Sequence, residues 1–387
     1  PPSEVSEHDL KESILKFECK FNDSNDTAHW LGIIDPEKLF AQWEPYLKSS
    51  LTSRQLSTIC ALSERKGYVS LKSQIFSMLC LLRRGLRLEH DFSHISSSPT
   101  TVRDRFFSFI KALQPWVDEM IRLPTPAEWL AANNSMQKSK RQKSTIRECY
   151  PDHLFFFVDG SVTQVFAPSD STGKAKLFNQ KHGMHCVSWY ILVTPDGRIV
   201  YCSHVYDGSI GDRNAWVFSK IACICSRKRK GPYSTKHDKT CRRFNRREPL
   251  VCKALKEAYP GAACFVLEDP LNEGASKEFT PAIGGDKAFP CIELPDYPGL
   301  PGLFHLFTTQ TGESERDKND PFRHSDPGIA AHRSVVERSI GIIKKWLILS
   351  HTDFISKQSQ SDLTLLLRFL AALSNYQVFV DRQQKYL

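Results

Sequence analysis

The sequence predicts an α/β protein in which an all-helical N-terminal part precedes a domain built on a β-sheet. Three observations lead to this prediction. Apolar residues recur at helical spacing between about residues 36 and 123. Short apolar runs and a tight Pro195-Asp196-Gly197 turn indicate strands after residue 150. Further helical patterns follow residue 330.

The composition favours a folded intracellular protein with acidic partners. Of the 387 residues, 41% are hydrophobic and 25% are charged, as in ordinary globular proteins. The 12 cysteines show no repeated short spacing, so we expect reduced thiols rather than a disulfide framework. The net charge of +9 is concentrated in two basic blocks, 137–147 and 226–247. These blocks predict solvated loops, or else phosphate contacts or a nuclear import signal.

The patterns divide the chain into four expected segments. A flexible N-terminal segment (1–35) precedes a helical domain (36–123). A basic linker (124–150) then leads to the sheet domain (151–380). We expect a basic insertion within that domain, at about 224–262.

The helical domain ends in a pattern typical of a helix-turn-helix. A short helix (86–95) and a Ser-Pro turn precede a longer helix (100–121), which Pro115 can kink or divide. The start of the longer helix carries side chains that can contact phosphates and base edges in a major groove: Thr100, Thr101, Arg103 and Arg105. A plain helical bundle explains the same pattern, so both interpretations stay open.

The sheet domain begins with the run LFFFV at 154–158, which suits a buried strand. Two further strands, 185–194 and 198–206, flank the Pro-Asp-Gly turn. The remaining patterns predict weaker strands at 262–267 and 282–285 and helices at 212–221, 330–348 and 363–380.

Three acidic residues follow or lie on these elements. Asp159 directly follows LFFFV, and Gly160 beside it allows close approach of a ligand. Asp286 follows a short apolar segment with two glycines, and Glu337 lies on the helix predicted at 330–348. That helix has one polar stripe, formed by Arg333, Glu337, Gly341 and Lys344.

Three carboxylates on separate elements can hold Mg²⁺ or Mn²⁺, which prefer oxygen ligands. Two such ions can activate water and stabilise the departing oxygen in phosphodiester cleavage. Arg333 and Lys344 can neutralise a phosphate nearby. A single acidic residue is more often a cap or a surface group, so spacing alone does not establish the site.

Four segments taken together resemble the nuclease of PIF/Harbinger-type transposases. They are FFFVDGS, the strand-hairpin-strand unit that leads to Gly208, Ser209 and Asp212, the segment GGDKAFP, and HRSVVERSIGIIKKW. The resemblance covers roughly residues 70–380 and includes the N-terminal helices, which fit the family's helix-turn-helix module.

The resemblance implies an RNase H-like catalytic core: a mixed sheet flanked by helices, with its first three strands antiparallel. It implies that Asp159, Asp286 and Glu337 are catalytic and hold two Mg²⁺ or Mn²⁺ ions. The expected activity is cut-and-paste transposition in the nucleus, by hydrolysis at element ends and strand transfer. The expected partners are terminal-repeat and target DNA, a second copy of the chain, and a Myb-like accessory protein.

Several assignments stay open. Asp286 lies 127 positions after Asp159 (286 − 159), so Asp269, after the strand AACFVLED, is a rival. Asp212 can assist the metal or cap a helix. Four residues in the insertion can ligate zinc or be scattered thiols and a histidine: Cys223, Cys225, His237 and Cys241.

Two other functions remain possible for the same sequence. A domesticated derivative would bind DNA or protein without cutting. A related nuclease would act on RNA or hybrid duplexes, although the additional helical domain disfavours that interpretation.

Overall fold

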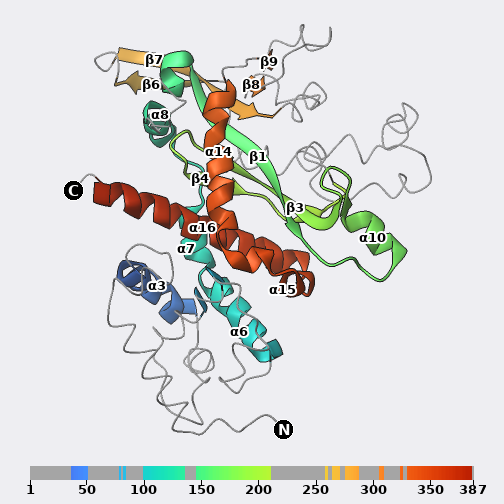
Figure 1. Cartoon of the computed structure of the whole chain (residues 1–387). Coiled ribbons are helices and arrows are strands. Elements are labelled where there is room, and N and C mark those ends of the chain that lie inside the picture. The colour runs from blue at the N-terminus through green and yellow to red at the C-terminus, as the bar shows by residue number, and fades with distance from the viewer. Residues whose placement is uncertain are drawn as a thin grey trace, which may run out of the picture. The chain divides into compact units, whose positions relative to one another are not determined.

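A computed structural model of the chain describes residues 36–50, 78–79, 82–83, 99–135, 145–210, 258–259, 264–270, 275–286, 305–308, 323–325 and 329–385. These residues form two compact units. Unit 1 joins residues 1–121 to 342–387, and unit 2 comprises residues 122–341. Figure 1 labels the helices and strands of both units.

Unit 1 is helical and has an aromatic core. Its helices are α3 (Pro36–Ser50), α6 (Pro99–Ala112), α7 (Gln114–Met120), α15 (Thr352–Ser356) and α16 (Gln360–Lys385), with a short 3₁₀ turn, η6 (Leu347–Ser350). The Trp43 ring lies 5.7 Å from Phe109, 5.3 Å from Trp116 and 5.7 Å from Phe369. The core therefore combines side chains from the two ends of the chain.

The position of α16 differs from the division expected from the sequence. We expected residues 363–380 to belong with the sheet domain, but α16 packs against α6 and α7 within unit 1. The physical reason is that Trp43, Phe109 and Trp116 can be buried only if another apolar surface covers them. Phe369 and its neighbours on α16 provide that surface.

The described residues do not support a helix-turn-helix. Its expected first helix and turn fall on residues 84–98, which lie outside the described residues. The expected longer helix is two helices, α6 and α7, which are separated at Leu113, and Pro115 lies in the first turn of α7. Pro is well accommodated there because its missing N–H is not needed in a first turn.

Unit 2 is built on a mixed sheet whose strand order is β2-β3-β1-β7-β8-β9. β1 (His153–Gln164) runs antiparallel to β3 (Met184–Val193) and parallel to β7 (Ala275–Gly285). β8 (His305–Thr308) and β9 (Arg323–Ser325) extend the parallel side. Besides β1, three further strands pair with β3, namely β2 (Phe178–Asn179), β4 (Ile199–Cys202) and β5 (Tyr206–Asp207), and β6 (Phe265–Asp269) pairs with β7.

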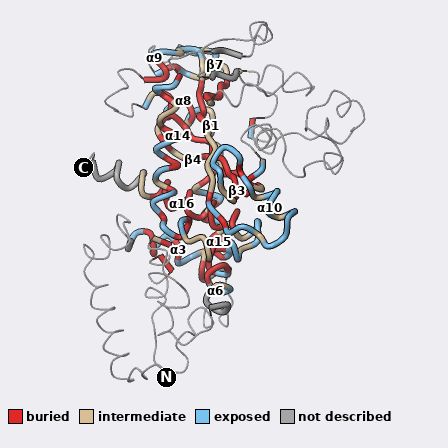
Figure 2. The backbone as a smooth tube through the Cα atoms, turned by 45° about the vertical axis from the view of Figure 1, so that its right-hand side comes forward, coloured by how far each residue is buried: buried red, intermediate tan, exposed pale blue. Residues whose placement is uncertain are grey.

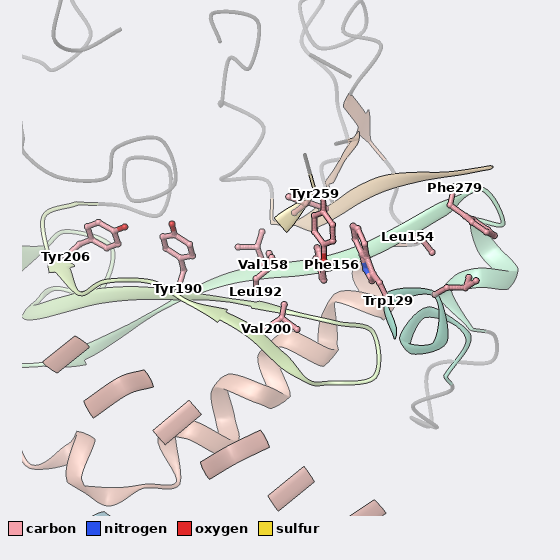
Figure 3. Close-up of a cluster of buried hydrophobic side chains, with 12 residues drawn as sticks. Trp129, Leu154, Phe156, Val158, Tyr190, Leu192, Val200, Tyr206, Tyr259 and Phe279 are labelled. Atoms are coloured by element: carbon pink, nitrogen blue, oxygen red, sulfur yellow. The ribbon is translucent and has the colours of Figure 1, made fainter. Parts of the chain in front are cut away.

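Both faces of the sheet carry helices, as the sequence predicted. The even residues of β1 join a buried cluster with Trp129 of helix α8 (Pro126–Asn134), whose ring stacks on Phe156 at 4.0 Å (Figure 3). Phe157, an odd residue of β1, faces Ile329 at the start of helix α14 (Ile329–Lys344) through the gap left by Gly284. The wholly apolar run LFFFV is explained by this burial on both sides.

Residues 124–150 are not simply a linker, because they contain α8 and the short helix α9 (Ile146–Cys149). Each helix begins with a capping box, Thr125 with Glu128 and Thr145 with Glu148. A hydrogen bond from Arg122 is the main cause that lowers the pKa of Glu128 to about 2. The basic residues 136–144 lie outside the described residues.

Helix α8 also completes the hydrogen bonding of β1. β1 pairs with β7 as far as Phe157 and with β3 only from Phe157 onward, so one side of Phe155 has no neighbouring strand. The Asn133 amide accepts from the Phe155 N–H at 2.8 Å, and Trp129 Nε1 donates to the Phe155 carbonyl at 2.8 Å. These two side chains replace a strand at that position.

Helix α14 lies against the β3–β4 hairpin. Ser339 Oγ donates to the Gly197 carbonyl at 3.3 Å. Gly197 has a φ of 92°, a conformation that the tight turn requires and that glycine adopts without strain. The expected hairpin is therefore present, and it fixes one point along the helix that carries Glu337. In the part of the chain that the structure describes, no helix has the length and apolarity to cross a membrane.

Candidate active site

Asp159 lies on β1 just beyond the point where β1 stops pairing with β7. Its carboxylate is partly exposed, with 21% of the side chain accessible. The Gly160 N–H donates to Oδ1 at 2.9 Å, and Arg333 Nη1 donates to Oδ2 at 3.0 Å. Two donors therefore hold this carboxylate in one orientation.

Glu337 is held by the same arginine. Arg333 Nη2 lies 2.6 Å from Glu337 Oε1, one turn away on α14. Glu337 is 52% exposed, whereas Arg333 is only 19% exposed. One guanidinium group thus joins two carboxylates that are 178 positions apart in sequence (337 − 159). Arg333 Nε is buried and has no hydrogen-bond partner among the described residues.

Asp286 follows β7, the parallel neighbour of β1. The last pair between these strands is Phe157 with Gly284. If the same register continued two residues further, Asp286 would stand opposite Asp159, and neighbouring strands are roughly 4.8 Å apart. Because side chains alternate along a strand, Asp286 would then lie on the α14 side of the sheet with Asp159.

Gly284 packs tightly against β1 two residues before Asp286. A Cβ atom at this position would lie 2.6 Å from the Phe157 ring, so the ring covers the backbone of β7 there. Any larger residue would move the ring or the strand, and Asp286 lies only two residues further on. The glycine in the segment IGGD is therefore needed for strand packing next to the acids.

Asp269, the rival to Asp286, lies elsewhere. It pairs with Ala275 at the start of β7, whereas Asp286 follows the end of that strand. The 11 positions between Ala275 and Asp286 (286 − 275) correspond to about 36 Å of extended chain. Asp269 is fully buried, and Arg147 Nη2 lies 2.5 Å from its Oδ2. The carboxylate of Asp269 therefore serves a buried ion pair.

The donor chemistry of the three acids fits a hard divalent cation, because carboxylate oxygens are the ligands that such ions prefer. The Arg333 guanidinium stands in for such a cation, because it already places one positive group between Asp159 and Glu337. Among the described residues, no three acidic, histidine or cysteine side chains stand close enough to hold an ion in this arrangement. A cation shared by these acids would therefore take the place of the guanidinium.

The other candidate residues are only partly described. Arg103 is bonded to Asp104 within α6, and Lys344 ends α14 with an exposed side chain. The side chains of Thr100, Thr101 and Arg105 lie outside what the structure describes. So do Asp212, most of the basic insertion, and the four candidate zinc ligands Cys223, Cys225, His237 and Cys241.

A comparison with protein families found a match in this region. Residues 158–238 match the family model of the DDE superfamily endonucleases. The match begins at Val158, one residue before Asp159, and continues through β3, β4 and β5. It does not extend to Asp286 or Glu337, so the DDE resemblance of those two residues rests on their motifs and geometry. No curated protein and no solved structure matches the chain.

Sequence reasoning did not anticipate the contacts that Arg333 makes at this candidate site. The stripe on α14 suggested that Arg333 contacts a phosphate, but the structure pairs it with two of the three acids. The spacing of Arg333 and Glu337 by one helical turn was a usable signal for their ion pair. The approach of Asp159 had no such signal, because it depends on how α14 lies against β1.

Proposed function

We propose that this chain is a metal-dependent DNA endonuclease and transposase of the Harbinger type. The observation that carries the proposal is the meeting of Asp159 and Glu337 on one guanidinium. The register of β1 and β7, extended two residues beyond its last pair, supports Asp286 as the third acid. The match of residues 158–238 to DDE superfamily endonucleases supports the nuclease chemistry, and the motif around Glu337 supports the subtype.

The strand order supports an RNase H-like core. β1, β3 and β4 are consecutively paired and antiparallel, and β7 and β8 follow in parallel on the other side of β1. This is the arrangement that the resemblance implied: three antiparallel strands at one side of a mixed sheet, with helices on both faces. In such a sheet Asp159 on β1 and Asp286 after β7 would lie near each other.

Asp159, Asp286 and Glu337 are the residues that would hold Mg²⁺ or Mn²⁺. When bound, the divalent cations supply the Lewis acidity for attack on a phosphodiester. The Gly160 N–H holds the Asp159 carboxylate in place, and Arg333, once released from the acids, can pair with a phosphate of the substrate. Lys344 lies further along the same helix and would add positive charge for the DNA backbone.

The proposed partners follow from cut-and-paste chemistry. Two element ends have to be held together, so we expect at least two copies of the chain on DNA. A Myb-like accessory protein is a further proposed partner, and the nucleus is the proposed location.

A nicking assay on supercoiled plasmid in Mg²⁺ or Mn²⁺ tests the proposal. Asp159→Asn, Asp286→Asn and Glu337→Gln should each abolish nicking and leave the thermal unfolding transition in place. The control is Glu268→Gln, which removes an exposed acid of the same sheet and should nick like the wild type. Normal nicking by Asp159→Asn and Glu337→Gln would refute the proposal.

The same geometry favours one second candidate, a derivative that binds DNA without cutting it. Arg333 pairs with both Asp159 and Glu337, and a chain that keeps this pairing permanently would not load metal. In that case the wild type would bind plasmid but would not nick it, and the three acid variants would bind as well as the wild type.

A further inference from the structure

Helix α10 (Ser171–Leu177) and its flanks form an exposed projection beyond the end of β1. The helix contains no buried residue, and Figure 2 shows α10 largely in the colour of exposed residues. A helix of seven residues is too short to be stable on its own in water, and a helix normally buries one apolar face. Something other than burial therefore holds α10 in place.

The N-terminal end of α10 is fixed by capping. The Asp170 carboxylate accepts a hydrogen bond from the Gly173 N–H at 2.6 Å. A Cβ atom on Gly173 would come within 2.8 Å of Pro168, so the turn before the helix is tightly closed. The only acid of the projection is therefore used for capping.

The C-terminal end of α10 is fixed to the turn after β5. The Ser209 N–H donates to the Lys176 carbonyl at 2.9 Å, and Asn179 Nδ2 donates to the Gly208 carbonyl at 2.8 Å. A Cβ atom on Gly208 would lie 2.4 Å from the Leu177 carbonyl oxygen, so no other residue fits there. Both ends of α10 are held rigidly while its sides face solvent.

The exposed side chains of the projection are basic and aromatic. Lys174, Lys176 and Lys181 are exposed, and Asp170 is the only acid between residues 166 and 182. Among the described residues four large apolar side chains are exposed, and the two aromatic ones flank α10: Phe166 at 57% and Phe178 at 39%. Basic side chains bind nucleic-acid phosphates, and exposed rings stack on unpaired bases.

We propose that the α10 projection, residues 166–182, binds an unpaired DNA strand next to the active site. The proposal rests on the proposed function, because it assumes that the chain acts on DNA. The lysines bind the phosphates and the phenylalanine rings stack on bases. β1 connects the two places directly, since Gln164 at its end is five residues from Asp159, or about 16 Å.

The experiment measures binding of a short fluorescent oligothymidylate, and of a duplex of the same length, to the full chain in EDTA. Lys174→Gln/Lys176→Gln should weaken oligothymidylate binding and lower the slope of log affinity against log salt by about 1.4, or 0.7 per lost phosphate contact. Phe166→Ala and Phe178→Ala should each weaken it by roughly 5- to 150-fold, with little effect on the duplex.

The control is Lys111→Gln/Lys357→Gln, which removes the same charge from exposed lysines of unit 1 and should bind oligothymidylate like the wild type. Equal affinities of the lysine pair and this control would overturn the proposal. The preference for unpaired DNA would be overturned if the lysine pair weakened duplex binding as much as oligothymidylate binding, and if the two phenylalanine variants left both affinities unchanged. A wild type that binds no DNA would overturn both this proposal and the proposed function. The variants Asp159→Asn, Asp286→Asn and Glu337→Gln distinguish the two, because they should lose nicking but still bind oligothymidylate.

Discussion

At the residue scale, Arg333 is the residue that pairs with two of the three carboxylates of the candidate site. Its guanidinium is mostly buried and serves two carboxylates, and charge-assisted hydrogen bonds of this kind are the strong ones. A divalent cation and the guanidinium compete for the same oxygens. A cation held by these acids would take the place of Arg333, and the freed guanidinium could then pair with a phosphate of the substrate.

This competition predicts that Arg333→Gln binds Mn²⁺ more tightly than the wild type when DNA is absent. A hydrogen bond to a charged group contributes about 1.5–3 kcal/mol, so we expect at least a roughly tenfold gain in affinity. Isothermal titration calorimetry measures it. Lys277→Gln is the control, since it removes a cation 2.8 Å from another carboxylate, that of Asp152. An unchanged or weaker affinity for Arg333→Gln would show that the guanidinium does not compete with the metal.

Two glycines near the acids should respond in opposite ways to the same substitution. Gly284→Ala forces the Phe157 ring to move, and overpacking of this kind costs about 1–3 kcal/mol. Gly341→Ala places its Cβ in open space on α14, and Ala is favoured over Gly in a helix by about 1 kcal/mol. Urea denaturation should therefore show a lower free energy of unfolding for Gly284→Ala and a higher one for Gly341→Ala. Stabilisation by both would mean that the Phe157 ring is not held against β7.

At the element scale, β1 is the strand on which the site depends. It carries Asp159, pairs with β3 on one side and β7 on the other, and leads to the α10 projection. At Phe155, where β3 no longer pairs with β1, side chains of α8 make the hydrogen bonds to the β1 backbone instead. The position of β1 therefore depends on a helix that lies in a segment predicted to be a linker.

Asn133→Leu tests this dependence. The substitution keeps the branched shape of the side chain but leaves the buried Phe155 N–H without its acceptor, which costs about 1–3 kcal/mol. We expect a lower midpoint of urea denaturation. The control is Asn134→Leu, because that residue is only half-buried and no hydrogen bond from it to β1 is present among the described residues. Equal stability of the two variants would mean that α8 does not substitute for a strand.

At the scale of the whole molecule, the two ends of the chain build one unit. Trp43, Phe109 and Trp116 from the first part are buried together with Phe369 from the last helix. The described helices before residue 121 therefore share their core with α16, unlike those of an independent DNA-binding module.

This organisation predicts that residues 36–121 alone do not fold cooperatively. Thermal unfolding followed by circular dichroism should show no sharp transition for that fragment. In the full chain, Phe369→Ala should lower the free energy of unfolding by about 3–5 kcal/mol, as expected for a fully buried ring. A cooperative transition of the isolated fragment would contradict the shared core.

The sequence predicted the positions of helices and strands better than it predicted which elements pair or pack with one another. LFFFV gave the start of β1 correctly, but the strand continues to Gln164 because β3 pairs with its polar end. Helix α8 was missed although its capping box, Thr125 to Glu128, is readable in the sequence. The burial of Asp269 beside Arg147, which favours Asp286 as the site residue, depends on the tertiary structure, and so does the packing of α16 against α6 and α7. Neither follows from local pattern.

The most direct test of the account is an anomalous difference map from crystals of the full chain grown with Mn²⁺. We expect a metal peak bound by the carboxylates of Asp159 and Asp286, with Glu337 beside it and Arg333 turned away from Asp159. The account would be contradicted by a map in which Arg333 still joins Asp159 to Glu337 and the only metal peaks lie at other acids.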